Sequence, residues 1–188
     1  MSLILASTSP RRKELLAQLG VEFDCVAPDI EEAQQSGETP EQYVLRLAKD
    51  KSRTGLNLGS SDSDVSLGSD TVVVCDGVVL EKPIDYADAR RMLSMLSGRQ
   101  HQVMTAVAVT SKNKQSSVVV TTNVWFKPLS QQEIERYWQS KEPCDKAGSY
   151  GIQGIGGRFV TRIEGSYHAV VGLPLYETDQ LLREFNNE

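Results

Sequence analysis

Cations are concentrated at a predicted helix start near the amino terminus, in the segment STSPRRKELL. Ser9 followed by Pro10 is typical of a helix N-terminus, with a capping side chain and proline at the first helical position. The first turn then carries Arg11, Arg12 and Lys13, although the helix dipole favours acidic residues there. Free N–H groups at a helix start bind anions, and guanidinium groups pair with phosphate oxygens. The pattern therefore leaves two hypotheses, a phosphate site or a solvated basic turn.

A second group of polar residues surrounds a predicted hairpin in the segment LGSDTVVVCDGVVLEKP. The pair Asp76-Gly77 between two valine runs predicts a two-residue turn, and its register places Thr71 opposite Lys82. Strict alternation puts Asp70 on the other face, so a bulge or an early end of pairing is needed for the three to converge. The alternative is a surface Asp–Lys pair at the base of the hairpin.

Lys51 continues the buried stripe of a helix predicted to begin at Thr39, after Val44, Leu47 and Ala48. A lysine in such a stripe either extends its ammonium group to solvent or places it in a cleft that holds an anion. The residue pattern alone leaves both interpretations open.

An acidic loop offers candidate metal ligands at Asp29, Glu31 and Glu32. Mg²⁺ is typically held by one or two carboxylates together with phosphate oxygens and waters. Asp70 and one of these acids could supply that pair. The alternative is an acidic loop that is merely solvated.

The segment DKAGSYGIQGIGG is rich in glycine, which permits unusual backbone angles and a close approach to a ligand. It fits neither a Walker A loop nor a dinucleotide-binding fingerprint, and the chain has no G-x-S-x-G nucleophile elbow. Lys146, Tyr150 and Gln153 give it recognition chemistry. An ordinary flexible loop is the alternative interpretation.

Composition limits the classes of function. The 188 residues are 39% hydrophobic and 24% charged, which is typical of one globular domain or one domain with two lobes. A net charge of −5 repels nucleic-acid phosphates, so we expect no nucleic-acid partner. No stretch approaches the length of a membrane span or a signal peptide, so we expect no membrane partner. Three scattered cysteines suit a reducing cytoplasm, and two histidines exclude a histidine-rich metal site.

The elements that must position these residues alternate between strand and helix, with paired strands, which predicts an α/β fold with a mixed sheet. Polar or glycine-rich loops are expected at 57–66 and 141–157. Strands are predicted at 3–6, 23–27, 103–110, 118–126 and 159–163. Helices are predicted from 10, 39, 85, 130 and 174, and those that begin at Thr39 and Ser130 have the spacing of a capping box.

Five segments, in order, resemble the motifs of the Maf-type nucleoside triphosphate pyrophosphatases: ASTSPRR, LGSDTVV, LEKP, DKAGSYGIQG and IEGSYHAVVGLPL. The resemblance covers nearly the whole chain. It implies one Maf-like domain over 1–188, with a Maf/inosine triphosphatase-like fold. That fold is α/β, an elongated mixed β-sheet flanked by helices, with two lobes around a central cleft. The family also implies a divalent metal cation, Mg²⁺ or Mn²⁺, and a homodimer.

The resemblance assigns roles residue by residue. Asp70 matches the catalytic proton acceptor, and Glu32 together with Asp70 matches the metal ligands. The positions that match phosphate-binding residues are Ser9, Arg12, Lys51 and Lys82. The positions that match the substrate-specificity set of the dTTP/UTP branch are Arg11, Thr71 and Gln153.

The expected function is therefore metal-dependent hydrolysis of dTTP and UTP to the monophosphate and pyrophosphate in the cytoplasm, by water attack at the α-phosphorus. Modified pyrimidine nucleotides stay open as further substrates. Two other classes stay open. One is a non-catalytic nucleotide-binding regulator of septum formation and cell division. The other is a phosphatase or nucleotidyl transferase that uses the same phosphate site, which a different product would reveal.

Overall fold

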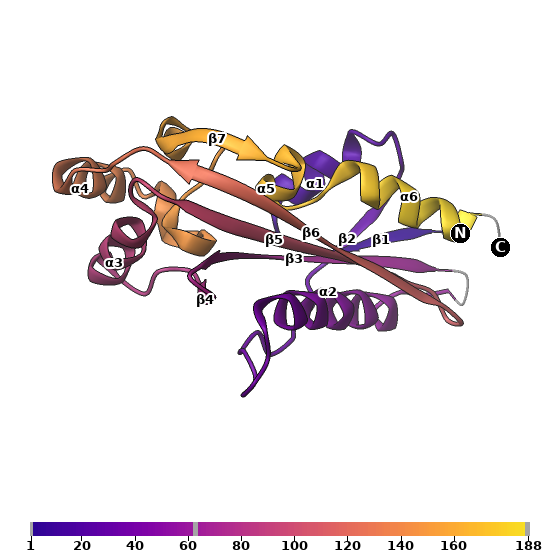
Figure 1. The fold of residues 1–188 in the computed structure, drawn as a ribbon. Helices are drawn as coiled ribbons and strands as arrows, with labels where there is room; N and C mark the ends of the chain where they lie inside the picture. Colours follow the sequence, from indigo (N-terminus) through magenta and orange to yellow (C-terminus); the bar gives the residue numbers. More distant parts are fainter. Residues whose placement is uncertain (1, 62–63, 187–188) are drawn as a thin grey trace. The chain divides into compact units, whose positions relative to one another are not determined.

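Seven strands form one mixed sheet in the order β2-β1-β3-β5-β6-β7, with β4 paired to β3. The computed structural model describes residues 2–61 and 64–186 (Figure 1). The strands are β1 (Leu3–Ala6), β2 (Asp24–Val26), β3 (Val65–Cys75), β4 (Val78–Leu80), β5 (Gln100–Thr110), β6 (Gln115–Phe126) and β7 (Val160–Glu164). The helices are α1 (Pro10–Ala17), α2 (Pro40–Asn57), α3 (Tyr86–Leu96), α4 (Gln131–Gln139), α5 (Tyr167–Val171) and α6 (Leu175–Asn186). The predicted α/β class with a mixed sheet is confirmed.

The chain divides into two compact units, in agreement with the two lobes expected from the family resemblance. The first unit comprises Met1–Asp70, Thr105–Val120 and Gly172–Glu188, and the second comprises Thr71–Met104 and Thr121–Val171. Strands β3, β5 and β6 each contribute residues to both units.

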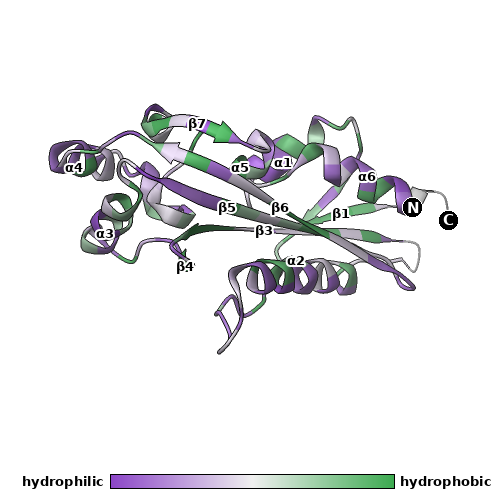
Figure 2. Ribbon diagram, in the orientation of Figure 1, coloured by the Kyte–Doolittle hydropathy of each residue, from purple (hydrophilic) through white to green (hydrophobic). Residues whose placement is uncertain are grey.

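In the first unit, β1 pairs in parallel with both β2 and β3. All four residues of β1 are buried, which is typical of a parallel strand covered on both faces. Figure 2 shows hydrophobic residues along β1, whereas α2 alternates between hydrophobic and hydrophilic positions. The capping box predicted at the start of α2 is present, because the side chains of Thr39 and Gln42 each bond the other's backbone N–H.

In the second unit, β3 and β4 form the predicted hairpin, with Cys75 opposite Val78. Asp76 and Gly77 both have positive φ, 51° and 76°, as the favoured two-residue hairpin turn requires. The expected register is confirmed, but pairing ends at Val73 opposite Leu80 and does not extend to Thr71 and Lys82, so the early end of pairing is the departure that the structure shows. The strand ends early because the carbonyl of Glu81 accepts a hydrogen bond from Gly148 N at 3.1 Å and Pro83 follows.

The core of the second unit is aromatic at its centre. Phe126 packs edge-to-face on Tyr150 at 4.7 Å between ring centroids, and Tyr137 packs in the same manner on Phe159 at 5.0 Å. Aliphatic side chains of α3, including Met92, Leu93 and Leu96, complete this core. Among the described residues, none of the helices is both long and apolar enough to cross a membrane.

Three local predictions are corrected by the structure. The side chain of Ser9 makes no capping hydrogen bond to α1, and its backbone N–H donates to the hydroxyl of Ser7 at 3.1 Å. The expected loop at 141–157 contains three short 3₁₀ helices, at Glu142–Asp145, Ala147–Ser149 and Ile155–Phe159. The expected loop at 57–66 is shorter, because α2 runs to Asn57 and β3 begins at Val65; residues 62 and 63 of that prediction lie outside the described residues.

Candidate active site

Lys51 lies between two carboxylates in the first unit. Its ammonium nitrogen is 2.7 Å from Asp70 Oδ1 and 2.7 Å from Glu32 Oε1. Lys51 and Asp70 are buried, with exposed fractions of 7% and 8%, whereas the Glu32 side chain is 49% exposed. Of the two interpretations of Lys51, extension of the ammonium group into solvent is wrong, because the group is buried against two carboxylates of the protein.

Helix α2 can approach β3 closely enough for this contact because Gly68 has no side chain. A Cβ at Gly68 would overlap the carbonyl oxygen of Ala48 and the backbone nitrogen of Ser52. Lys51 lies between those two helix positions, and Asp70 lies two residues beyond Gly68 on the same strand. The close packing of backbone on backbone therefore brings the ammonium group of α2 to the carboxylate of β3.

Arg12 of α1 belongs to the same charged environment. Its Nε donates to the carbonyl of Gly172 at 2.9 Å, and the hydroxyl of Ser69 donates to that same carbonyl at 3.0 Å. Burial lowers the pKa of the Arg12 guanidinium, and nearby Arg11 lowers it further. The carboxylates of Asp70 and Glu32 partly oppose this by raising the pKa. Arg12 nevertheless stays charged, so it adds positive charge beside both carboxylates.

The structure thus brings together four of the predicted site residues: Arg12, Glu32, Lys51 and Asp70. Arg11 and Ser9 lie at the start of α1 in the same unit, both partly buried. In a cluster of this kind, two cations and the N-terminus of α1 favour phosphate oxygens, while the two carboxylates favour a metal ion or a proton.

The remaining three predicted residues belong to the second unit. Thr71 is partly buried on β3, Lys82 is exposed after β4, and Gln153 is exposed between two 3₁₀ helices. Within that unit, Thr71 and Lys82 are not paired across the hairpin, as described above.

The segment that carries Gln153 is held by Glu142, a residue that the sequence analysis did not identify. Its carboxylate accepts from Tyr137 Oη at 2.7 Å, Ile155 N at 2.8 Å and Gly156 N at 3.0 Å. Tyr137 Oη in turn accepts from Gly151 N at 3.1 Å. The available signal was an acidic residue immediately before Pro143 and the glycine-rich run, because glycine-rich segments expose many N–H donors.

The oxygen donors of this cluster are of the type that a divalent cation prefers. Glu32 and Asp70 direct one oxygen each at a single cationic nitrogen, so the pair already stabilises positive charge at one point. Within residues 2–61 and 64–186 there is no group of three or more His, Cys, Asp or Glu side chains placed to hold a metal. The two carboxylates therefore fit a metal that takes its other ligands from phosphate and water.

The five motifs of the sequence analysis all lie within a match to a known family. Residues 2–185 match the family model described as Maf-like protein. A protein of Vibrio parahaemolyticus named dTTP/UTP pyrophosphatase is 71% identical over 98% of this chain and 97% of the relative. A Vibrio vulnificus protein of the same name is 72% identical over 97% of this chain and 98% of the relative. A solved dITP/XTP pyrophosphatase of Mycobacterium abscessus has 19% identity and a TM-score of 0.43, covering 67% of this chain and 73% of that one. The chain belongs to the Maf-like protein family.

Proposed function

We propose that this protein is a nucleoside triphosphate pyrophosphatase that hydrolyses dTTP and UTP to the monophosphate and pyrophosphate. The relatives named dTTP/UTP pyrophosphatase support it, since their identity with this chain extends over nearly its full length. The observation that carries the chemistry is the Lys51 ammonium held between Asp70 and Glu32, beside Arg12. Such a cluster offers cations for phosphate oxygens and carboxylates for a proton or a metal.

In the proposed reaction, Asp70 orients a water molecule and accepts its proton. The water oxygen forms a bond to the α-phosphorus, and the bond from the α-phosphorus to the oxygen bridging it to the β-phosphorus breaks. The electron pair of that bond leaves with pyrophosphate. Arg12 and Lys51 neutralise the negative charge that develops on the phosphate oxygens, and catalysis consists mainly of positioning and charge stabilisation.

A divalent cation is implied by the family, and Glu32 and Asp70 are the residues that would hold it. Mg²⁺ or Mn²⁺ bound there would supply positive charge to the triphosphate and polarise the α-phosphoryl group. Lys51 then has a second role, because its ammonium group keeps the two carboxylates directed at one point before substrate binds.

The other proposed roles concern substrate binding. Ser9 at the start of α1 and Lys82 of the second unit bind phosphate oxygens. Gln153 reads the edge of a pyrimidine base through its amide, while Arg11 and Thr71 restrict which base is accepted. Exposure of Gln153 in a segment held by Glu142 supports the recognition role, because an exposed amide remains available for a ligand.

We also propose that residues 1–188 act as a single Maf-like domain, that the protein is a cytoplasmic homodimer, and that it acts on free nucleotides rather than nucleic acid or membranes. The negative net charge supports the last point, because it disfavours both polyanionic surfaces.

The test is product analysis with dTTP, UTP, CTP, GTP and 7-methylguanosine triphosphate, each with Mg²⁺, scoring pyrophosphate against orthophosphate. We expect pyrophosphate from dTTP and UTP in preference to the others. Pyrophosphate released mainly from a nucleotide with another base would support the proposed reaction and contradict the proposed specificity for dTTP and UTP. Nucleotide binding without any pyrophosphate would instead favour a regulatory protein.

A further inference from the structure

Glu32 is fixed at the candidate active site although its own segment has no regular secondary structure. Residues 30–38, which we call the Glu32 segment, contain no helix or strand, and nearly all of them are exposed. An exposed glutamate on irregular chain samples many side-chain and backbone conformations. The ion pair with Lys51 alone is a weak constraint, because the Glu32 side chain is half exposed to solvent.

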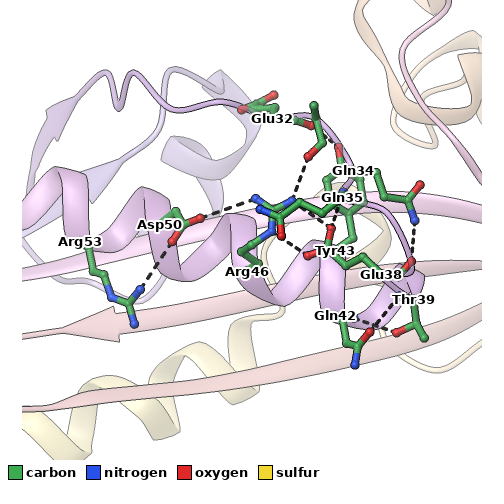
Figure 3. Close-up of polar contacts among 11 residues, drawn as sticks. Glu32, Gln34, Gln35, Glu38, Thr39, Gln42, Tyr43, Arg46, Asp50 and Arg53 are labelled. Atoms are coloured by element: carbon green, nitrogen blue, oxygen red, sulfur yellow. Dashed lines mark hydrogen bonds and ion pairs between the residues drawn. The ribbon is translucent and has the colours of Figure 1, made fainter.

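Tyr43 holds the segment at Glu32 itself. The Tyr43 hydroxyl donates a hydrogen bond to the backbone carbonyl of Glu32 (Figure 3). The tyrosine is only 1% exposed, so its ring is locked in the core of the first unit and its hydroxyl has a fixed position. The bond therefore ties the backbone of Glu32 to helix α2.

Arg46 holds the same segment at two further points. Its Nε and one terminal nitrogen donate to the two carboxylate oxygens of Glu38 at 2.7 Å and 3.0 Å, a bidentate pair. The same terminal nitrogen donates to the carbonyl of Ala33 at 2.9 Å, one residue after Glu32. Glu38 also accepts from Gln35 N at 3.0 Å, which closes the segment on itself (Figure 3).

The spacing along α2 links these contacts to Lys51. Tyr43 and Arg46 are three residues apart and share one side of the helix, and Lys51 follows on the same helix two turns after Tyr43. One rigid helix thus carries both the groups that hold the Glu32 backbone and the ammonium group that contacts the Glu32 carboxylate. The position of Glu32 relative to Asp70 is consequently set by α2.

We propose that Tyr43 and Arg46 are positioning residues that hold Glu32 at Lys51 and Asp70 and thereby set the affinity of the site for its divalent cation. This inference rests on the proposed function, in which Glu32 is a ligand of that cation. Neither residue contacts the reacting atoms. Their effect is expected on metal affinity, with a much smaller effect on the rate at saturating metal.

The experiment compares Tyr43→Phe and Arg46→Lys with wild type and with Arg53→Met as a matched control. Tyr43→Phe keeps the buried ring and removes only the hydroxyl, while Arg46→Lys keeps the charge and loses the bidentate contact. Arg53 lies on the same helix and contacts Gln115 and Asp50, both outside the segment; Asp50 also pairs with Arg46, at 3.7 Å. Thermal unfolding of all four proteins confirms that each is folded.

The main readout is Mn²⁺ binding, followed by the loss of the free-ion electron paramagnetic resonance signal. It is measured with a deoxyuridine triphosphate analogue in which an imido group bridges the α- and β-phosphorus atoms. We expect Tyr43→Phe to weaken Mn²⁺ binding roughly tenfold, as removal of a ligand's hydrogen-bond partner does elsewhere. Arg46→Lys should weaken binding less, and Arg53→Met should bind as wild type does.

In parallel, the Mg²⁺ concentration for half-maximal dTTP hydrolysis should rise for both variants with little change in kcat. Folded variants that bind Mn²⁺ as wild type does would overturn the inference, as would an equal loss in Arg53→Met or a wild type that binds no Mn²⁺. If Tyr43→Phe does not fold, Arg46→Lys decides. A wild type that releases no pyrophosphate would refute the proposed function, while the Mn²⁺ titrations would still decide the role of Tyr43 and Arg46.

Discussion

Two irregular segments, one in each unit, carry proposed site residues and are each held by a carboxylate, yet the partners of the two carboxylates differ. In the first unit, Glu38 closes the Glu32 segment on the charged guanidinium of Arg46. In the second unit, Glu142 closes the segment that carries Gln153 on uncharged donors, the hydroxyl of Tyr137 and two backbone N–H groups.

The difference has electrostatic consequences. The bond from Arg46 is the main cause that lowers the pKa of Glu38, so the first segment depends on an ion pair. Burial raises the pKa of Glu142, but the N–H of Gly156, the hydroxyl of Tyr137 and the N–H of Ile155 together bring it below its ordinary value. The charge of Lys146 lowers this pKa further, as the last of the causes, so the second segment depends mainly on uncharged donors to one partly buried acceptor. We call the Glu32 segment with Lys51 and Asp70 the charged region. We call the segment that carries Gln153 the uncharged region, because its hydrogen-bond donors to Glu142 are uncharged. The chemistry is proposed in the first and base recognition in the second.

The largest expected effect comes from Asp70→Asn in the charged region. Loss of the proton acceptor should lower kcat by about 10²–10⁴-fold for every nucleotide alike. The fold should persist, because Lys51 keeps its contact with Glu32. Steady-state kinetics on dTTP and UTP measure the change in kcat, and thermal unfolding shows whether the fold persists. Near-normal turnover, or a loss confined to one nucleotide, would end the assignment of chemistry to this region.

The two regions should lose stability at different pH values. His101 donates to or accepts from the hydroxyl of Tyr150 at 2.8 Å in the second unit, and burial lowers the pKa of His101 to about 4 from its ordinary 6.5. The unfolded chain therefore binds a proton that the folded chain does not, and stability falls as pH drops from 6.5 to 4. The whole effect is on the order of 3 kcal/mol.

The Glu38–Arg46 pair behaves differently, because a lowered carboxyl pKa gives stability that is lost only below the ordinary pKa of 4.5. As the pH falls from 6.5 to 5, backbone amides near Tyr150 should therefore lose protection against hydrogen exchange before those of the Glu32 segment do. His101→Phe should flatten the dependence of the unfolding free energy on pH in this range. An unchanged slope in that variant would show that His101 is not its cause.

Glu142→Gln should test the uncharged region. An amide in place of the carboxylate presents a donor to at least one of the three groups that now donate to Glu142, leaving it unsatisfied. We expect a loss of about 1–3 kcal/mol in the free energy of unfolding, measured by urea denaturation. Glu135→Gln on α4, which is exposed, serves as the control. Equal stability of the two variants would mean that solvent holds the segment as well as Glu142 does.

The smallest effect is expected from Gln153→Glu. A carboxylate cannot donate to the C4 carbonyl that uracil and thymine carry and cytosine lacks, so kcat/KM for dTTP and UTP should fall by about tenfold relative to CTP or GTP. Stability should not change, because the side chain is exposed. A uniform loss of kcat/KM for all the nucleotides tested would assign Gln153 a structural role. It would also contradict the proposal that base recognition belongs to the uncharged region.

Features decided by near neighbours in the chain were predictable. The Asp76-Gly77 turn and the capping boxes at Thr39 and Ser130 are local hydrogen-bond and dihedral requirements, and the structure confirms them. The stripe that contains Lys51 was also predictable, because helix periodicity alone places it toward the core.

Features that depend on distant contacts were not predictable. The pairing of Lys51 with Asp70 requires Gly68 to admit α2, and no local pattern reports that approach. The turns of 141–157 depend on the carboxylate of Glu142, which accepts hydrogen bonds from the N–H groups of Ile155 and Gly156, more than ten residues further along the chain. Capping by the side chain of Ser9 was wrong, and the structure offers no local reason for it: the Ser9 N–H donates to Ser7, but that is not a group that an N-cap side chain satisfies.

The most direct test of the account is hydrolysis of dTTP in ¹⁸O-labelled water, with mass spectrometry of the two products. Attack at the α-phosphorus predicts one labelled oxygen in dTMP and unlabelled pyrophosphate. Label in pyrophosphate, or the appearance of labelled orthophosphate as the first product, would contradict the proposed reaction and the role given to Asp70.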